Sequence, residues 1–256
     1  MAPRSEPAGD FDYERAGAGY AQVRRPDPRI AERVHAALGD ARTVVNVGAG
    51  AGSYEPTDRE VTAVEPSEVM RAQRPARLSR AIDGIAEDLP FEDDSFDAAM
   101  ATVTVHQWRD LERGLHEMRR VSRGPVVIVT FDPEVLDHFW LNDYVPEIIA
   151  AERPRYPEID RISRLLGGHS TVAPVPIPID CVDGFGEAFY GRPEAFLDPA
   201  VRAAQSGWAF VDPTTIERFV DTLGSALESG DWDRRFGYLR EEPEYVGSLR
   251  LIAATP

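Results

Sequence analysis

Three glycines and a glutamate form the first group of residues that could bind a ligand. The segment VVNVGAGAGS, residues 44–53, ends an apolar run with Gly48, Gly50 and Gly52 at alternate positions. Glycine at the end of a buried strand lets a ligand come close to the backbone. Glu65 ends the next apolar run, where a carboxylate can accept hydrogen bonds from both hydroxyls of a ribose. The spacing therefore favours a cofactor with a free ribose, either NAD or S-adenosylmethionine.

Two features of this segment favour S-adenosylmethionine over NAD. The glycine pattern is GxGxG, because Ser53 stands where the dinucleotide fingerprint has a third glycine or alanine. The connection over 53–60 is short and contains Pro56, so no full helix can follow the glycines. A pyrophosphate binds best at a helix N-terminus, whereas a sulfonium is compatible with a chain of net charge −16.

His106 is the first candidate for a general base. It lies in the segment TVTVHQWRD, a few residues past the end of an expected strand. A histidine with a pKa near neutrality can take a proton from a hydroxyl or an amine. A structural histidine bonded to a backbone carbonyl is equally compatible with the sequence, and His138 and His169 are weaker alternatives for the base. The five histidines lack metal-ligand spacing, so we expect no bound metal.

Alternating strands and helices place these residues at one edge of a sheet. Hydrophobic periodicity predicts helices over 13–20, 28–38, 67–73 and 110–122, and strands over 43–47, 61–64, 96–103, 125–131 and 248–254. This alternation predicts an α/β fold with a mainly parallel, doubly wound sheet. The stretch 171–181 reads as an edge strand or a bend, because three prolines interrupt it at every second position.

Composition and charge exclude several functions. Acidic residues number 44 against 28 basic ones, which disfavours a nucleic acid or an anionic membrane as partner. Every basic residue is arginine, so neither a Schiff-base lysine nor a phosphate-loop lysine is present. Cys181 is the single cysteine, which excludes an internal disulfide. We expect a cytoplasmic protein without a signal peptide or a membrane-spanning segment.

Four ordered motifs resemble the class I S-adenosylmethionine-dependent methyltransferases, and among them the bacterial small-molecule methyltransferases. The motifs are VVNVGAGAG, VTAVEPSEVM, GIAEDLPFEDDSFDAAMATVTVHQW and LHEMRRVSRGPVVIVTF. The resemblance covers roughly residues 10–131 and the closing segment GSLRLIAAT. It implies a Rossmann-like fold with an antiparallel C-terminal strand. It also implies in-line methyl transfer to a small-molecule acceptor, with S-adenosylhomocysteine as product.

The resemblance implies a cofactor site built from several motifs. The glycine loop would pass the methionine part, the end of the second strand would hold the ribose, and GIAEDLPF would border the adenine. An N-terminal element, YAQVRRP, would close over the methionine carboxylate. The implied residues are Tyr20, Arg24, Gly48, Ala49, Gly50, Gly52, Glu65, Pro66, Met70, Ile85, Ala86, Glu87, Thr102 and Val103.

The sequence departs from the family pattern at two positions. Asn46 stands where the family usually has an acid, and Ile85 stands where an aspartate commonly contacts the adenine amine. Recognition of the cofactor's amino group by Asn46 is therefore doubtful, and a hydrogen bond from the adenine amine to the side chain at position 85 is not expected.

We expect a single domain over 1–256. Its cofactor-binding core would lie at about 28–131, a helical lid with the acceptor site at about 132–170 and 182–246, and a closing strand at about 248–254. Two alternatives remain open. A nicotinamide-dependent oxidoreductase would share Glu65 and the glycines, and a non-catalytic cofactor-binding or regulatory protein would lack a productive acceptor pocket.

Overall fold

The centre of the computed structural model is a six-stranded sheet, and the structure describes residues 9–17 and 19–256. The strand order is β2-β1-β3-β4-β8-β5. Strands β2, β1, β3 and β4 are parallel, whereas β8 is antiparallel to both of its neighbours. This confirms the expected Rossmann-like α/β fold with an antiparallel C-terminal strand. The strands are β1 Thr43–Val47, β2 Glu60–Val64, β3 Ala98–Thr102, β4 Val126–Phe131, β5 His169–Pro174 and β8 Leu249–Thr255.

Helices cover both faces of this sheet, because its central strands are apolar on both sides. Val44 of β1 packs in one apolar cluster with helix α3, Pro28–Ala37. The next residue, Val45, packs in a second cluster with helix α5, Leu111–Val121. Parallel strands buried on both faces read as continuous apolar runs, which is why the sequence located them.

Three helices begin at the capping residues of the sequence. The side chains of Asp27, Ser67 and Asp110 each accept a hydrogen bond from a backbone N–H in the first turn of α3, α4 (Glu68–Ala72) and α5. Such caps satisfy donors that have no partner within the helix. These caps fix the residues at which the three helices begin.

The connection from β1 to β2 contains no helix, as the sequence predicted. Turns carry the chain over residues 48–59 instead. Gly48, Gly50 and Gly52 have φ angles of +69°, +51° and +91°. Only glycine adopts such angles readily, so all three support the turn regardless of any ligand.

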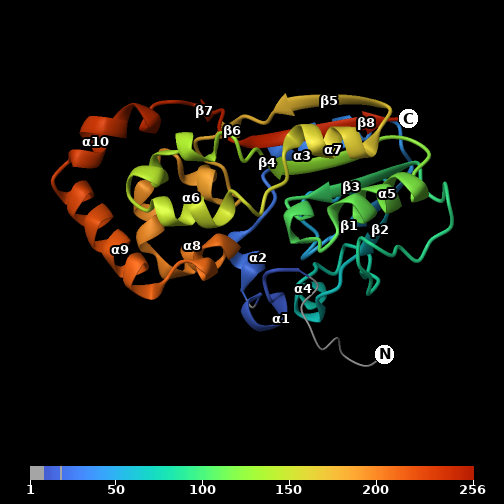
Figure 1. The fold of residues 1–256 in the computed structure, drawn as a ribbon, viewed down its shortest axis with the longest axis horizontal. Coiled ribbons are helices and arrows are strands. Elements are labelled where there is room, and N and C mark those ends of the chain that lie inside the picture. Colours follow the sequence, from blue (N-terminus) through green and yellow to red (C-terminus); the bar gives the residue numbers. More distant parts are fainter. Residues whose placement is uncertain (1–8, 18) are drawn as a thin grey trace.

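The segments between β4 and β8 contribute a helical half that lies beside the sheet (Figure 1). An aromatic core holds this half together, with the ring of Trp140 lying 5.6 Å from Phe196 and 5.5 Å from Trp232. We call the helices of this helical half the lid segments. They are α6 Pro146–Glu152, α8 Pro199–Ala203, α9 Pro213–Glu228 and α10 Asp231–Phe236, with the 3-10 helices η2 Leu136–His138, η3 Trp140–Asp143, η4 Gly186–Phe189, η5 Pro193–Leu197, η6 Ser206–Phe210 and η7 Gly237–Arg240.

One helix of the first expected insertion lies apart from the lid segments. Helix α7, Ile159–Leu166, packs against α5 and β8 on the sheet. Its buried side chains, Ile162 and Leu166, belong to the same apolar cluster as α5. The end of the expected 132–170 insertion therefore covers the sheet, because α7 is apolar on that face. The rest of the division into core and lid stays a prediction.

The proline-interrupted stretch 171–181 divides between two sheets. Strand β5 ends at Pro174 and forms an edge of the main sheet. Strand β6, Ile177–Pro178, pairs with β7, Glu244–Tyr245, in a separate two-stranded sheet. Proline cannot donate a ladder hydrogen bond, so an edge position suits it. The prediction of an edge strand or bend is confirmed.

The N-terminal helix predicted over 13–20 is instead two short helices. They are α1, Tyr13–Ala16, and α2, Tyr20–Val23, and Gly19 before α2 has a left-handed φ of +81°. Helix α1 packs against α4, and the two helices lie side by side in Figure 1. The stretch 1–8, where no signal peptide is expected, lies outside the described residues.

Candidate active site

A cavity of about 790 Å³ lies at the carboxyl ends of β1, β2 and β3. Strand order reverses at β1, and ligands of doubly wound sheets bind at such a point. We call this space the cofactor cavity. Among the expected cofactor residues, all except Arg24 and Gly52 line it. These are Tyr20, Gly48, Ala49, Gly50, Glu65, Pro66, Met70, Ile85, Ala86, Glu87, Thr102 and Val103.

Glu65 is held in place by backbone groups on both sides. One carboxylate oxygen accepts a hydrogen bond from the N–H of Gly50 at 2.8 Å, and the other accepts one from the N–H of Ser67 at 2.8 Å. The residue is 7% exposed, and burial raises the pKa of its carboxyl. Each oxygen keeps a second lone pair. Glu65 can therefore accept hydroxyl donors from the cavity without losing its own support.

The three glycines serve different purposes. A side-chain Cβ at Gly48 would lie 2.2 Å from Thr104 Oγ1, and one at Gly52 would lie 2.4 Å from Leu78. These two glycines permit close packing within the protein. At Gly50 a Cβ would meet only Met70, at 3.4 Å. Gly50 is therefore the position where a side chain would enter the cavity itself.

Glu87 and Asn46 support the site from outside the cavity's centre. An oxygen of Glu87 accepts hydrogen bonds from the backbone N–H of Arg109 and of Asp110 at 2.8 and 3.1 Å. Asn46 is fully buried and donates to Glu55, at 2.9 Å. Asn46 does not line the cavity, which agrees with the doubt that it recognises a cofactor amino group.

A second, smaller cavity of about 60 Å³ adjoins the first. The two cavities share Tyr13, Tyr20 and Val103 as lining residues. Val103 has a φ of +51°, which is an outlier for a β-branched residue and ends β3 abruptly at this shared wall. We call the smaller space the acceptor cavity. Most of its lining comes from the lid segments and the residues around them.

Arg24 lies at the acceptor cavity, contrary to the expected contact with the cofactor's carboxylate. Its Nε is 2.6 Å from Oδ1 of Asp183, and Asp183 is 1% exposed. The hydroxyl of Tyr54 donates to the other oxygen of Asp183 at 2.6 Å. Tyr54 belongs to the glycine loop's connection and has a φ of +63°. The cluster joins the N-terminal element, this connection and the loop between β6 and η4.

His106 lines the acceptor cavity from the 3-10 helix η1, Val105–Gln107. With its amide oxygen facing its donor neighbours, Gln107 accepts a hydrogen bond from His106 Nε2 at 2.8 Å. His106 Nδ1 is buried and has no partner among the described residues. The ring of Tyr156 lies 4.6 Å away. This tautomer leaves the Nδ1 lone pair available to a ligand.

The titration expected for His106 near neutral pH is wrong. Burial, with the nearby charges of Arg155 and Arg24, lowers the pKa of His106 to about 3. The ring is therefore neutral under ordinary conditions. His138 and His169 are exposed and line neither cavity, so the structure does not bring them to the site.

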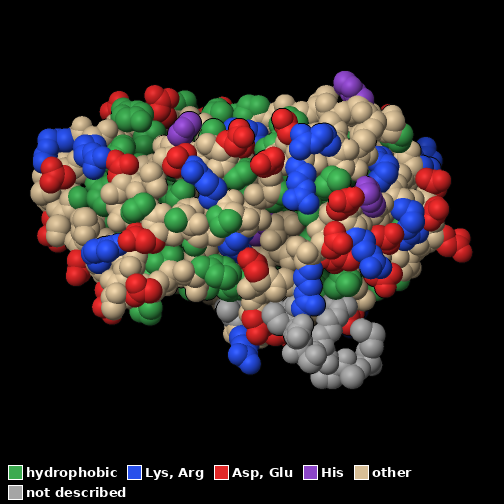
Figure 2. Space-filling view, viewed as in Figure 1, with side chains coloured by type: hydrophobic (Ala, Val, Ile, Leu, Met, Phe, Trp, Pro, Cys, Tyr) green, Lys and Arg blue, Asp and Glu red, His purple; other side chains and the backbone are tan. Residues whose placement is uncertain are grey.

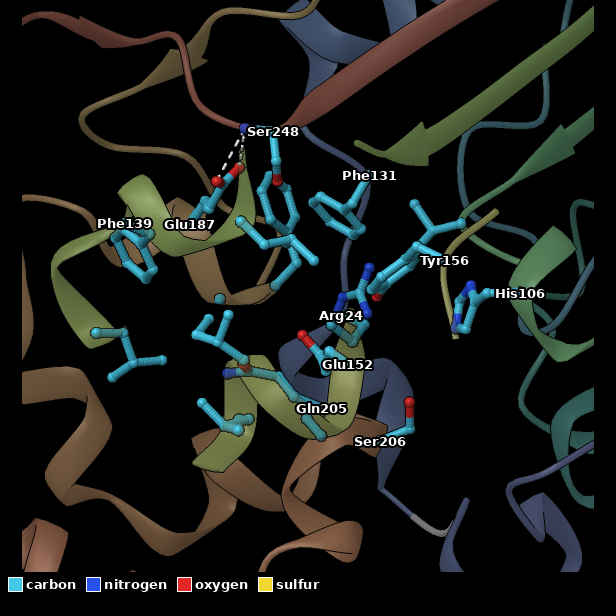
Figure 3. A pocket seen from close by; sticks show the side chains of 18 of the residues that line it. Arg24, His106, Phe131, Phe139, Glu152, Tyr156, Glu187, Gln205, Ser206 and Ser248 are labelled. Carbon is cyan, nitrogen blue, oxygen red and sulfur yellow. Dashed lines mark hydrogen bonds between the residues drawn. The ribbon is translucent and has the colours of Figure 1, made fainter. Parts of the chain in front are cut away.

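Two carboxyl residues that line the acceptor cavity were not predicted from the sequence. Glu152 and Glu187 both line it, and burial raises the pKa of each to about 7. Both oxygens of Glu187 accept a hydrogen bond from the N–H of Ser248 at 2.9 Å. Figure 3 places Glu152 beside Arg24 and Tyr156, with Glu187 further along the cavity. The one available signal was an acidic residue within an aromatic-rich segment, which is too common to be decisive.

Neither a membrane-spanning helix nor a metal cluster is found in the described part of the chain. No helix within residues 9–17 and 19–256 is long and apolar enough to cross a bilayer. Among the same residues, no group of three or more histidine, cysteine, aspartate or glutamate side chains is arranged to hold a metal ion.

Comparisons with known proteins agree with the geometry of the cofactor cavity. The methyltransferase domain family matches residues 45–129. A malonyl-[acyl-carrier protein] O-methyltransferase from Halorhodospira halophila is 29% identical over 42% of this chain. A 2-methyl-6-phytyl-1,4-hydroquinone methyltransferase from Oryza sativa is 33% identical over 41% of it. The matches span 41% and 33% of the length of these two curated relatives.

A solved structure resembles nearly the whole chain. It is a protein of Anabaena variabilis assigned as a methyltransferase of an antibiotic biosynthesis pathway, 31% identical, with a TM-score of 0.85. The match covers 92% of this chain and all of the other. The cofactor cavity contains the buried carboxylate of Glu65 and a glycine at which a side chain would intrude. The chain belongs to the S-adenosylmethionine-dependent methyltransferases, whose cofactor is S-adenosylmethionine.

Proposed function

We propose that this chain methylates a small molecule held in the acceptor cavity. The observation that carries the proposal is the shared wall of the two cavities, formed by Tyr13, Tyr20 and Val103. A cofactor in the larger cavity and an acceptor in the smaller one meet at this wall. When bound, S-adenosylmethionine supplies the methyl group, which leaves its sulfur by in-line displacement and gives S-adenosylhomocysteine.

In this proposal, different residues of the cofactor cavity bind different parts of the cofactor. Glu65 holds the ribose hydroxyls, because its carboxylate is fixed and retains accepting capacity. Met70, Ile85 and Ala86 provide the apolar surface for the adenine. Gly50 leaves room for the methionine part to approach the backbone. Positioning of this kind can contribute up to about 7–11 kcal/mol to such a reaction.

His106 orients the acceptor in this proposal, and it can receive the proton of an acceptor that reacts through oxygen. Its Nδ1 has no partner among the described residues, and the residue lines the acceptor cavity together with several other polar side chains. A pKa of about 3 makes the ring a weak base. A hydroxyl oxygen that has gained a methyl group is far more acidic than before, so a weak base suffices once transfer has begun. A methylated amine needs no such base, because it can leave as an ammonium.

We further propose a single cytoplasmic domain that does not bind nucleic acid. The net charge of −16 supports the last point. On the face drawn in Figure 2, acidic and basic side chains lie interspersed rather than in one basic stripe. The lid segments are the part of the domain that we assign to acceptor binding.

The experiment must also distinguish this function from two alternative functions. A nicotinamide-dependent oxidoreductase would need room for a pyrophosphate at a helix N-terminus, and no helix follows the glycine loop. A non-catalytic cofactor-binding protein would have no use for an enclosed polar cavity next to the cofactor. The polar lining of the acceptor cavity favours catalysis over binding alone.

Calorimetric titration with S-adenosylmethionine and with NAD tests the cofactor assignment. We expect binding of the first and none of the second. Glu65→Ala should weaken binding by about 1.5–3 kcal/mol for each charged hydrogen bond lost. Glu60→Ala is the matched control, because Glu60 is exposed at the opposite end of the same strand. Equal affinities in the two variants would remove Glu65 from the site, and turnover on a metabolite panel then tests catalysis.

A further inference from the structure

We propose that the acceptor is a small amine, and that its nitrogen lies against Glu152 in the acceptor cavity. The proposal rests on the proposed function, since it assumes that this cavity holds the acceptor. It goes further by naming the chemical class of the acceptor and a residue that selects it. Three features support it: the charge of the cavity, its aromatic walls and the position of Glu152.

The positive charge of the acceptor cavity is already neutralised. Of the described residues that line the cavity, Arg24 alone is a permanent cation. Its guanidinium binds both oxygens of Asp183, at 2.6 and 3.4 Å. The pair is buried, with 10% and 2% of the two side chains exposed. Arg24 therefore attracts an anionic acceptor only weakly.

The two carboxyls of the cavity, in contrast, have no comparable cation. Oε1 of Glu152 lies 3.8 Å from Arg155, and Arg155 is itself bound to Asp10 at 2.6 Å. The hydrogen bonds recorded for Glu187 come from the backbone N–H of Ser248. The cavity thus has acceptor oxygens in excess of positive charge. A largely buried carboxyl whose nearest cation lies beyond hydrogen-bond distance is costly, and a cationic ligand relieves that cost.

Aromatic rings make up much of the remaining wall. Figure 3 shows Phe131, Tyr156 and Phe139 around the space in which Glu152 and Glu187 lie. The face of an aromatic ring carries partial negative charge and attracts a nearby cation. Aromatic faces and carboxyls together are complementary to an ammonium group. A carboxylate or phosphate acceptor would instead meet two acidic side chains without a free cation.

Glu152 is the carboxyl closer to the wall shared by the two cavities. It lies beside Arg24 (Figure 3), and Arg24 stacks over the ring of Tyr20, with 5.4 Å from guanidinium carbon to ring centroid. Tyr20 lines both cavities. Glu187, next to Ser248, lies further from Arg24 and His106 than Glu152 does in the same view. The amine nitrogen that receives the methyl group is therefore assigned to Glu152.

The protons balance in this arrangement. An ammonium group bound at Glu152 gives one proton to the carboxylate, which leaves a neutral amine with a free electron pair. That pair forms the bond to the methyl carbon while the carbon–sulfur bond breaks and its electrons remain on sulfur. The product is the methylated ammonium, and Glu152 releases its proton to water. Glu152 is suited to this exchange because burial raises the pKa of its carboxyl to about 7.

Matched ligands distinguish an amine from other acceptors. The protein is first saturated with S-adenosylhomocysteine, and calorimetry then measures binding of arylalkylamines of increasing chain length. Each amine is compared with the alcohol and the carboxylate of the same skeleton. We expect the best amine to bind about 10- to 100-fold more tightly than its alcohol, the range for one charged hydrogen bond, and the carboxylate to bind most weakly.

The Glu152→Gln variant tests the residue, because glutamine keeps the shape and loses the charge. We expect it to remove most of the preference for the amine while its affinity for S-adenosylhomocysteine is unchanged. Glu147→Gln is the control, since Glu147 lies on the same helix and pairs with Arg218 at the surface. It should bind all ligands as the wild type does.

Several results would overturn the inference. They are an alcohol or carboxylate that binds the wild type as tightly as its amine, a panel in which no amine binds the wild type, and an amine preference that survives Glu152→Gln. The wild-type comparison holds even if the variant fails to fold. Failure to bind S-adenosylhomocysteine in the first step would instead contradict the proposed function, so the two failures remain distinct.

Discussion

The two cavities are neighbours, yet the protein builds them in different ways. The cofactor cavity is formed largely by the ends of parallel strands and the turns that follow them, within residues 48–108 and the N-terminal element. The acceptor cavity is formed by side chains from at least five separate segments, which extend from Tyr13 to Ser248. The first depends on sheet topology, and the second depends on the packing of particular side chains.

This difference separates what is general in the fold from what is specific to the chain. The topology of a doubly wound sheet places a ligand at the switch point in many proteins. The acceptor cavity has no such constraint, because function resides in sites built on a fold rather than in the fold itself. Substitutions at the cofactor cavity should therefore affect every substrate alike, whereas those at the acceptor cavity should discriminate among acceptors.

The largest effect should follow from closing the cofactor cavity. In Gly50→Val the new side chain would enter the space next to Met70, and we expect no S-adenosylmethionine binding at concentrations that saturate the wild type. Gly39→Val is the control, because Gly39 has a similar φ of +58° with open space around it. Calorimetry and circular dichroism of both variants decide the matter. A folded Gly50→Val protein with normal affinity would place the ligand elsewhere.

A large effect confined to the acceptor side should follow from changing His106. We expect His106→Ala to keep its affinity for the cofactor and to lose turnover by roughly 10²–10⁴-fold, the range for a positioned base. His106→Asn tests the mechanism, since an amide can accept a hydrogen bond but cannot take a proton. Recovery of most of the turnover in that variant would indicate orientation alone. His138→Ala, at an exposed position, serves as control.

The buried cluster of Arg24, Asp183 and Tyr54 should matter mainly for stability. Asp183→Asn leaves Arg24 buried without its counter-charge, which should lower the free energy of unfolding by about 3–5 kcal/mol. Asp180→Asn removes a pair with Arg29 at the exposed surface, so little or no change in the free energy of unfolding is expected. Urea unfolding of both variants measures the contrast. Equal losses would show that the buried cluster does not hold the halves together.

The smallest effect should appear in the pH dependence of stability. The pKa of Glu152 is about 7 in the folded protein against 4.5 for an ordinary glutamate, so between these values the folded state keeps a proton that the unfolded state loses. Glu152 therefore lowers the free energy of unfolding as pH rises through this window, and Glu187 does the same. His106, with a lowered pKa, acts in the opposite direction between about pH 3 and 6.5.

Comparison of one variant with the wild type isolates the contribution of Glu152 to the pH dependence of stability. Relative to the wild type, Glu152→Gln should gain up to about 3 kcal/mol of stability on going from pH 4.5 to pH 8. Unfolding by urea at the two pH values measures the difference. A wild type and a variant that change in parallel would mean that the pKa of Glu152 is the same in the folded and the unfolded state.

The sequence was sufficient for the cofactor side because the relevant signals are local. The position of Glu65 at the cofactor cavity could be predicted because it follows an apolar strand shortly after a glycine turn, and topology brings the two together. The caps at Asp27, Ser67 and Asp110 likewise act within a few residues of their own position. Such features depend on spacing along the chain, which the sequence displays directly.

The acceptor side could not be read in the same way. Asp183 is 129 residues from its partner Tyr54, and nothing along the chain indicates that the two would meet. Glu152 has an unusual pKa only because the lid segments bury it. Arg24 was assigned to the cofactor because its motif suggested so, whereas the aspartate that binds it lies 159 residues away, in the loop before η4. Long-range packing of irregular segments decided each of these outcomes.

The most direct test of the account is a crystal structure of the protein with S-adenosylhomocysteine bound. The account predicts that the ribose hydroxyls contact Glu65, that the adenine lies beside Ile85 and Ala86, and that the sulfur faces the wall between the two cavities at Val103. A sulfur directed away from that wall, or a cofactor bound outside the larger cavity, would contradict the proposal that the methyl group passes from one cavity to the other.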